Sequence, residues 1–189
     1  MHQHTDPTLT RTATLTLIAM LAFAGNSLLC RMALRNTGID PASFTTVRLL
    51  SGALVLWLIV RRRSGDQAMA GSWPSALALF TYAAGFSYAY VSLSAATGAL
   101  LLFGAVQATM ISYGLWRGER LTRQQLAGLL CAFAGLAGLL MPGVSAPPWA
   151  GAVLMLAAGA AWGIYSLRAK EAGNPTGATA GNFVRAVPL

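Results

Sequence analysis

Charged side chains are scarce in this sequence. Only 10% of its 189 residues are Asp, Glu, Lys or Arg, whereas a soluble domain has about 25%. The five acidic residues all lie outside the long apolar runs, so these runs offer no carboxylate to carry protons. The composition therefore excludes an ordinary soluble domain, and it excludes a proton-coupling carboxylate of the usual kind within these runs.

Residues that bind metals or perform covalent chemistry are also few. The two cysteines, Cys30 and Cys131, each stand within an apolar run and give no sign of a disulfide framework. His2 and His4 lie in the N-terminal tail, where a solvated pair is favoured over a metal site. A membrane-embedded enzyme, one alternative function, needs a nucleophile–base pair or a metal cluster, and the apolar runs contain no His, Asp or Glu. We therefore expect no enzyme, metal or cofactor.

Hydrophobic residues, by contrast, make up 56% of the chain and gather in long runs. A helix needs about 20 mostly apolar residues to cross a bilayer. Six runs approach or reach that length: Ala13–Leu34, Pro41–Val60, Trp73–Leu93, Thr97–Trp116, Thr122–Leu140 and Trp149–Leu167. The sequence predicts an all-α, polytopic membrane helix bundle with six full spans.

A seventh segment, Pro175–Leu189, follows the last full run. From Gly177 it offers 13 residues, or about 20 Å of helix, against a hydrocarbon core about 30 Å thick. A free terminal carboxylate near mid-bilayer is costly. We therefore expect this segment to lie at the cytoplasmic interface or to stay mobile.

The first run also has features of a secretory signal peptide. Arg11 precedes an apolar stretch, Leu15–Leu21, and Ala22-Phe23-Ala24 resembles a cleavage site. Apolar sequence continues past that site to Leu34, which is enough for a full span. A membrane span is the favoured interpretation, with cleavage as the alternative.

The net charge of +8 has two interpretations, a nucleic-acid-binding surface or a bias of basic residues toward cytoplasmic loops. The basic clusters flank the apolar runs without interleaved aromatic residues, so we expect no nucleic-acid partner. If successive loops lie on alternate sides of the membrane, the side of the N-terminus has nine basic residues and the opposite side has two. The nine are Arg11, Arg61, Arg62, Arg63, Arg117, Arg120, Arg123, Arg168 and Lys170, and the two are Arg31 and Arg35. This division predicts a multi-pass protein of the cell inner (plasma) membrane with a cytoplasmic N-terminus and an external turn at Met141–Pro148.

Two pairs of arginines indicate an internal repeat. Arg31 and Arg48 are 17 residues apart, as are Arg168 and Arg185, and each first Arg ends an apolar run. The first run would cross outward and the sixth inward, so the copies would be inverted. Inverted repeats are typical of secondary transporters. Coincidence between two helices rich in small residues is the alternative.

Three groups of motifs resemble the EamA family of drug/metabolite transporters. They correspond to its opening two spans, to the link between its fourth and fifth spans, and to the start of its second repeat. In that order they are Ala24-Gly25-Asn26 with Pro41 and Arg48, then Gly114–Gly128 (GLWRGERLTRQQLAG) with Gly135-Leu-Ala-Gly138, and finally Tyr165-Ser-Leu-Arg168 with Gly181-Asn-Phe-Val-Arg185.

The resemblance implies a fold of ten helices in two inverted five-helix repeats. On that plan residues 1–12 are a cytoplasmic tail, residues 13–140 are the first repeat, and residues 149–189 begin a truncated second repeat. The chain departs from the plan by lacking about three and a half helices and by having Gln107 where many members have a Pro.

The resemblance also implies a function, namely a secondary transporter or permease for small metabolites, and an exporter in particular. The expected partners are the lipid bilayer and a small-molecule metabolite. A non-transporting truncated membrane protein or scaffold fragment is the alternative. A homodimer is a further one, because two such chains would rebuild a cavity.

Polar and aromatic residues inside the spans are the candidate substrate-binding residues, since polar groups within a bilayer usually face the bundle interior. We expect Asn26 and Gln107 to face the interior between spans one, three, four and six, with contacts between helices as the alternative role. Arg48 is interpreted as an anion-attracting group, with snorkelling to the outer headgroups or a packing role as the alternatives. The complete set is Asn26, Gln107, Tyr82, Tyr90, Trp162, Tyr165 and Arg48.

Small residues recur four positions apart in two of the runs. Gly159 and Gly163 form one such step, and Gly128 with Ala132 forms another. This spacing lets helix backbones approach closely. We interpret these steps as structural packing sites.

Overall fold

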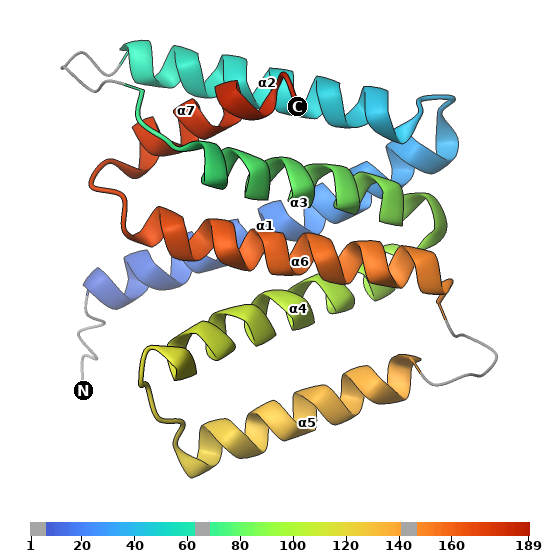
Figure 1. Ribbon diagram of the computed structural model, residues 1–189, viewed down its shortest axis with the longest axis vertical. Coiled ribbons are helices and arrows are strands. Elements are labelled where there is room, and N and C mark those ends of the chain that lie inside the picture. The colour runs from blue at the N-terminus through green and yellow to red at the C-terminus, as the bar shows by residue number, and fades with distance from the viewer. Residues whose placement is uncertain (1–6, 63–68, 141–146) are drawn as a thin grey trace, which may run out of the picture.

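The computed structural model describes residues 7–62, 69–140 and 147–189, and within these ranges it contains seven α-helices and no β-strand. Figure 1 shows the helices running back and forth across one layer. They are α1 (Pro7–Asn36), α2 (Pro41–Arg62), α3 (Trp73–Ser92), α4 (Ala95–Trp116), α5 (Arg123–Leu140), α6 (Trp149–Lys170) and α7 (Pro175–Ala186). The all-α prediction is confirmed, and every predicted run forms a helix with ends close to those expected.

Polar residues and prolines begin several of these helices. The Asp40 carboxylate accepts hydrogen bonds from the backbone N–H groups of Ala42 (2.9 Å) and Ser43 (3.0 Å) at the start of α2. Hydrogen bonding to Ser43, through its side chain and backbone, lowers the pKa of Asp40 below its ordinary value. The carboxylate is therefore charged at neutral pH, which suits the positive end of the helix dipole. Asn174 caps α7 in the same way, since its side chain accepts from the N–H of Gly177 at 3.0 Å.

Helix α6 is the centre of the bundle and packs along both α3 and α4. A Cβ atom on Gly159 would lie 2.5 Å from the backbone oxygen of Leu102, and one on Gly163 would lie 2.9 Å from the Cβ of Thr109. Both distances are shorter than side-chain contacts allow, so these glycines permit the close approach of α6 to α4. The structural interpretation of this step is confirmed.

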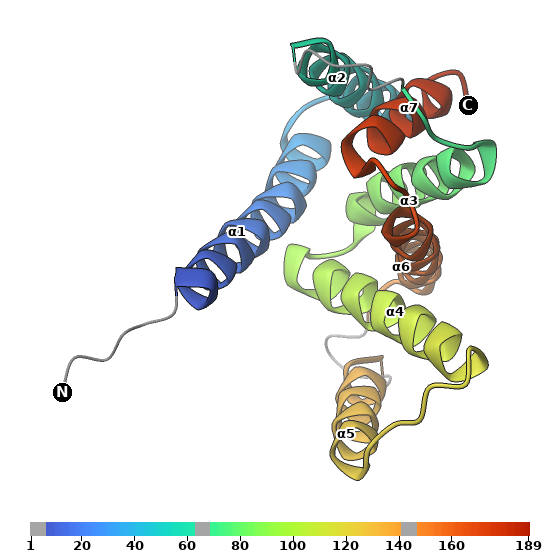
Figure 2. The same ribbon diagram turned by 90° about the vertical axis from the view of Figure 1, so that its left-hand side faces the viewer.

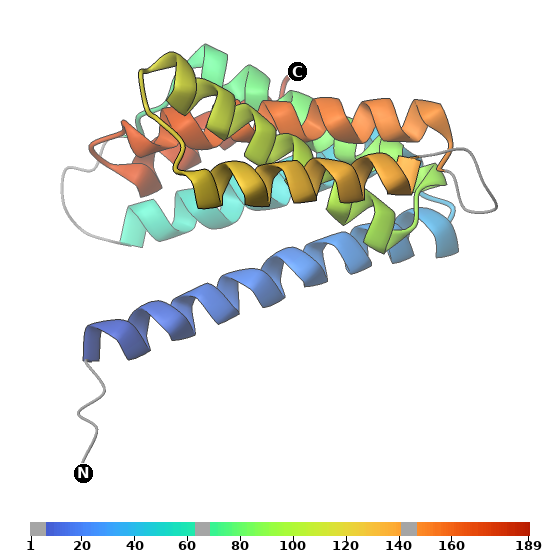
Figure 3. The same ribbon diagram turned by 90° about the horizontal axis from the view of Figure 1, so that it is seen from below.

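The small-residue step on α5, Gly128 with Ala132, does not lie against another helix in this way. A Cβ on Gly128 would meet nothing within 4 Å among the described residues. Helix α5 packs chiefly on α4 and lies at one edge of the layer, whereas α1 leans away from the other helices (Figures 2 and 3). Most side chains of both helices are exposed, which suits contact with lipid.

Helix α7 corrects the expectation that this segment stays mobile, because it is an ordered helix that packs on its neighbours. It packs against α2 and α3, and its small residues let it approach closely. Gly181 lies against the backbone oxygen of Ala70, where a side chain would not fit. The Asn182 side chain accepts a hydrogen bond from the N–H of Ser72 (2.9 Å), and Arg185 Nη1 donates to the Ala70 oxygen (2.9 Å). These contacts satisfy the polar groups of α7, so the segment docks as an ordinary helix of the bundle.

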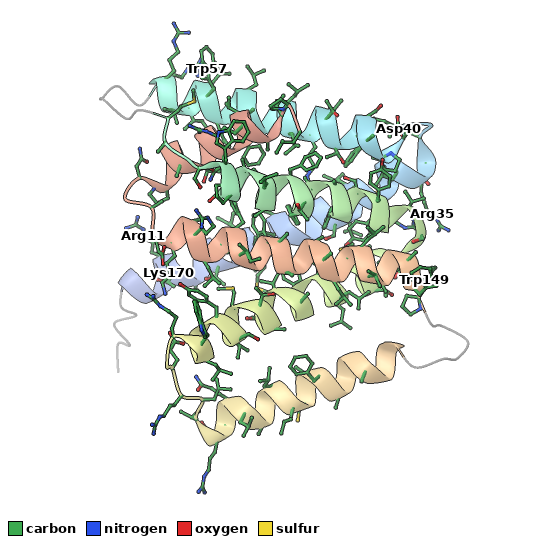
Figure 4. The ribbon with its side chains drawn as sticks, viewed as in Figure 1. Arg11, Arg35, Asp40, Trp57, Trp149 and Lys170 are labelled. Atoms are coloured by element: carbon green, nitrogen blue, oxygen red, sulfur yellow. The ribbon has the colours of Figure 1, made fainter. Side chains whose placement is uncertain are left out.

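Four of the described helical segments are long and apolar enough to cross a membrane: Thr10–Asn36, Pro41–Arg62, Ala95–Trp116 and Trp149–Lys170. Helices α3 and α5 occupy the other two predicted spans but are not among these four. Arg11 and Lys170 lie at one end of the layer, and Arg35, Asp40 and Trp149 lie at the other end (Figure 4).

Candidate functional site

A cavity of about 630 Å³ lies among α1, α2, α3, α6 and α7. The lining residues of α1, α2, α3 and α6 come from near the middle of these four helices, so the cavity lies about halfway between the two ends of the layer. Four of the seven predicted site residues line it: Asn26 from α1, Arg48 from α2, Tyr82 from α3 and Trp162 from α6. The structure therefore brings together residues that are up to 136 positions apart in the chain (162 minus 26).

Arg48 is the charged residue of the cavity lining. Its Nη2 donates a hydrogen bond to Tyr82 Oη (2.9 Å), and its guanidinium carbon lies 5.1 Å from the Tyr82 ring centre and 4.8 Å from the Phe86 ring centre. Contacts with two aromatic rings stabilise a cation by electrostatic attraction. The guanidinium is thus held on α3 instead of reaching toward the outer headgroups, which disagrees with the snorkelling alternative.

One nitrogen of this guanidinium is not paired. Nη1 of Arg48 is buried and has no hydrogen-bond partner in the part of the chain that the structure describes. A buried donor without a partner costs about 1–3 kcal/mol, and more when it is charged. This group is the main feature of the cavity that packing alone does not explain.

Aromatic rings form the wall beside Arg48. The rings of Tyr82 and Trp162 are 4.6 Å apart, and those of Phe23 and Trp162 are 6.4 Å apart. Phe183 of α7 also lines the cavity, and it fits because Gly52 on α2 has no side chain: a Cβ there would lie 2.5 Å from the Phe183 ring. The cavity therefore combines flat apolar surfaces with a few polar groups, which is the usual character of a site for a small organic molecule.

Two predicted site residues, Tyr90 and Tyr165, do not line the cavity. Tyr90 is fully buried near the end of α3. Its Oη donates to the Ala95 oxygen (3.3 Å), and its backbone oxygen accepts from Arg31 Nη1 (2.6 Å). Tyr165 is buried one turn from Trp162 and stacks on its ring at 5.4 Å. Tyr165 therefore supports a lining residue, whereas the ring of Tyr90 contacts Phe86 (4.7 Å), which is not part of the lining.

The structure places Gln107 away from Asn26, which corrects the expectation of one shared interior site. Gln107 is exposed on α4 and lines a separate groove of about 450 Å³ between α4 and α5. The face of α4 that packs inward contains Gly98, Leu102 and Val106, spaced four apart. Gln107 follows Val106 by one residue and so lies about 100° around the helix.

Several lining residues were not predicted, namely Phe23, Ser51, Gly52 and Phe183. Phe23 precedes Asn26 by three positions and Gly52 follows Arg48 by four, so helical spacing alone was a usable signal. Phe183 was missed because its segment was assigned to the membrane surface. Among the described residues, no group of three or more His, Cys, Asp or Glu side chains is placed to hold a metal ion.

One family of known proteins matches most of this chain. The EamA-like transporter family matches residues 10–141. An uncharacterized protein of Pseudomonas aeruginosa is 59% identical over 179 residues, which cover 94% of this chain and 62% of that protein. The chain therefore spans less than two thirds of the length of the curated relative it matches. No solved structure matches the chain.

Proposed function

We propose, since the chain belongs to the EamA-like transporter family, that it acts as a secondary transporter or permease for small metabolites. Its family and its apolar helices make it an integral membrane protein. In the proposal all six long helices cross the membrane, α1 to α5 form the first repeat, and α6 and α7 begin an inverted second one. Export is the proposed direction.

The position of the cavity is the observation that supports this function best. The cavity lies at mid-length of the helices and joins α1, α2 and α3 to α6 and α7. Inverted-repeat transporters bind their substrates near the bilayer midplane, where the two repeats meet. Asn26 and Arg48 place polar groups in an otherwise mainly apolar lining, as a site that must orient an organic solute requires.

Replacing Asn26 with leucine tests this function. The change removes a polar side chain from the cavity lining and keeps its approximate size, so a solute that hydrogen-bonds to Asn26 should bind about 10-fold more weakly. The measurement is uptake of a panel of radiolabelled metabolites into liposomes that contain the purified chain. Saturable uptake with a raised half-saturation concentration in Asn26→Leu supports the proposal. Absence of saturable uptake for the whole panel speaks against transport.

The proposed orientation has a test of its own. Asn36 is exposed at the end of α1 beside Arg35, and Gln124 is exposed in the first turn of α5 at the opposite end of the layer. In a background with Cys30 and Cys131 replaced by serine, a membrane-impermeant maleimide added to intact cells should label Asn36→Cys and spare Gln124→Cys. The reverse pattern would place the N-terminus outside. Labelling of both residues after the cells are permeabilised is the control.

A membrane protein that acts only together with another polypeptide is the second candidate. The small residues of α5 favour it: a Cβ on Gly128 or Gly135 would meet nothing within 4 Å among the described residues, and small residues let a partner helix approach closely. A second copy of the chain is one such partner. Cross-linking of the purified chain in lipid nanodiscs distinguishes a monomer from this arrangement.

A further inference from the structure

We infer that the central cavity binds the carboxylate of an organic monoanion at Arg48, with the apolar body of that anion lying against the aromatic wall. This inference rests on the proposed function, because it names the substrate class of the same cavity.

The charge balance of the cavity is positive. Arg48 is the charged residue of its lining, and no Asp or Glu of the sequence lies within a stretch predicted to span the membrane. An uncompensated charge is costly inside a bilayer, and such groups usually pair with an opposite charge or mark a substrate path. The two aromatic rings beside Arg48 offset part of that cost but bring no negative charge.

The hydrogen bonds of Arg48 are incomplete on one side. Nη2 is used by Tyr82 Oη, whereas Nη1 has no partner among the described residues. A guanidinium presents its N–H groups as a planar fork that matches the two oxygens of a carboxylate. A small rotation of the guanidinium would give Nη1 a carboxylate oxygen as its partner.

Three other arginines within or beside the helices have no buried guanidinium nitrogen that lacks a hydrogen-bond partner among the described residues. Arg31 donates to the backbone oxygen of Tyr90 (2.6 Å), Arg168 donates to the Ser75 hydroxyl (2.9 Å), and Arg185 donates to the backbone oxygen of Ala70 (2.9 Å). Each of these three thereby joins two separate helices or a helix and a loop. Arg48 differs because it combines a contact to a neighbouring helix with a buried, unpaired donor on the wall of a cavity.

Apart from Arg48, the lining is uncharged, so Arg48 sets the sign of the charge that the cavity favours. Asn26 and Ser51 supply neutral polar groups, while Phe23, Tyr82 and Trp162 supply apolar surface. The described lining contains no carboxylate to pair with an ammonium group. A monoanion with an apolar or aromatic body therefore fits the cavity better than a zwitterion or a cation of the same shape.

The test is binding to the purified chain in lipid nanodiscs, measured by equilibrium dialysis. The probes are radiolabelled 3-phenylpropanoate, the matching neutral amide 3-phenylpropanamide, the zwitterion phenylalanine and the dianion phenyl phosphate. The acid should bind about 10- to 100-fold more tightly than the amide, because the amide lacks a charge-assisted hydrogen bond to Arg48. The zwitterion and the dianion should both bind more weakly than the acid.

Substitutions locate the binding site. Arg48→Gln should reduce binding of the acid to the level of the amide, Arg48→Lys should keep part of the preference, and Arg35→Gln, which removes a charge outside the cavity, should behave like the unmodified chain. Equal binding of acid and amide by the unmodified chain would overturn the inference, and this comparison needs no variant that has to fold. Acid binding that survives in a folded Arg48→Gln variant would overturn it too, as would tighter binding of phenyl phosphate.

The inference and the proposed function can fail separately. Saturable uptake of neutral or cationic solutes, combined with no preference for the acid, would leave the transporter proposal standing and overturn the carboxylate site. Binding of the acid through Arg48 without uptake of any solute would support the site and contradict transport.

Discussion

Replacing Gly159 with leucine is expected to separate α6 from α4 and to destabilise the bundle by about 3 kcal/mol. A Cβ at this position would lie 2.5 Å from the backbone oxygen of Leu102 and 2.6 Å from the Cβ of Ala105. A backbone oxygen within a helix does not move aside as the end of a flexible side chain does. The whole of α6 must therefore shift, and α6 holds the centre of the structure through its contacts with α3 and α4.

The buried Cys30 thiol provides the measurement. Cys30 is 2% exposed, whereas Cys131 is exposed, so a Cys131→Ser background leaves one thiol that a dye reaches only when the bundle opens. Gly159→Leu should lower the midpoint of thermal labelling by about 6–12 °C in a chain of this length. Gly128→Leu is the matched control, because a Cβ there meets nothing within 4 Å among the described residues. Equal midpoints for the two variants would contradict the packing described for α6.

The membrane-spanning helices could be predicted from the sequence because length and hydrophobicity are local properties. The predicted span Pro41–Val60 needed only the apolar run itself, and α2 extends two residues further, to Arg62. The docking of α7 could not be predicted in this way. Its position depends on Gly181 and Asn182 fitting against Ala70 and Ser72, which is a tertiary contact that local hydrophobicity does not reveal.

The candidate site was predictable in part for a similar reason. The rule that polar groups within spans face inward identified Asn26 and Arg48, which both line the cavity. The same rule was wrong for Gln107, because α4 has two faces covered by different neighbours and Gln107 lies on the α5 side. The packing of small residues of α6 against Leu102 and Thr109 decides which face of α4 turns inward, and it leaves Gln107 on the α5 side.

The same packing connects the fold to the proposed site. Gly159 and Gly163 flank Trp162 on α6, and the close approach that they permit fixes the rotation of this helix. That rotation turns the Trp162 ring toward Tyr82 at the cavity, where the two ring centres are 4.6 Å apart. The Tyr165 ring, one turn further along α6, stacks on Trp162 with its ring centre 5.4 Å away. Helix packing and the aromatic wall of the cavity therefore depend on the same short segment.

In the proposed transporter, a solute passes through the cavity among α1, α2, α3, α6 and α7. Ala22 lines this cavity beside Asn26, one helical turn away on the same face of α1. A tryptophan at position 22 would place an indole in a cavity of about 630 Å³ and block it. Ala24 is also exposed on α1 but is not part of the lining, because two residues turn a helix by about 200°.

The most direct measurement is saturable uptake of one solute by liposomes containing Ala22→Trp or Ala24→Trp at equal protein density. Both variants add the same indole at nearly the same depth of the same helix, so effects on insertion and expression are matched. The account predicts that Ala22→Trp abolishes uptake, with at least about a 10-fold loss, whereas Ala24→Trp retains the rate of the unmodified chain. Equal uptake by the two variants would show that the solute does not pass through this cavity.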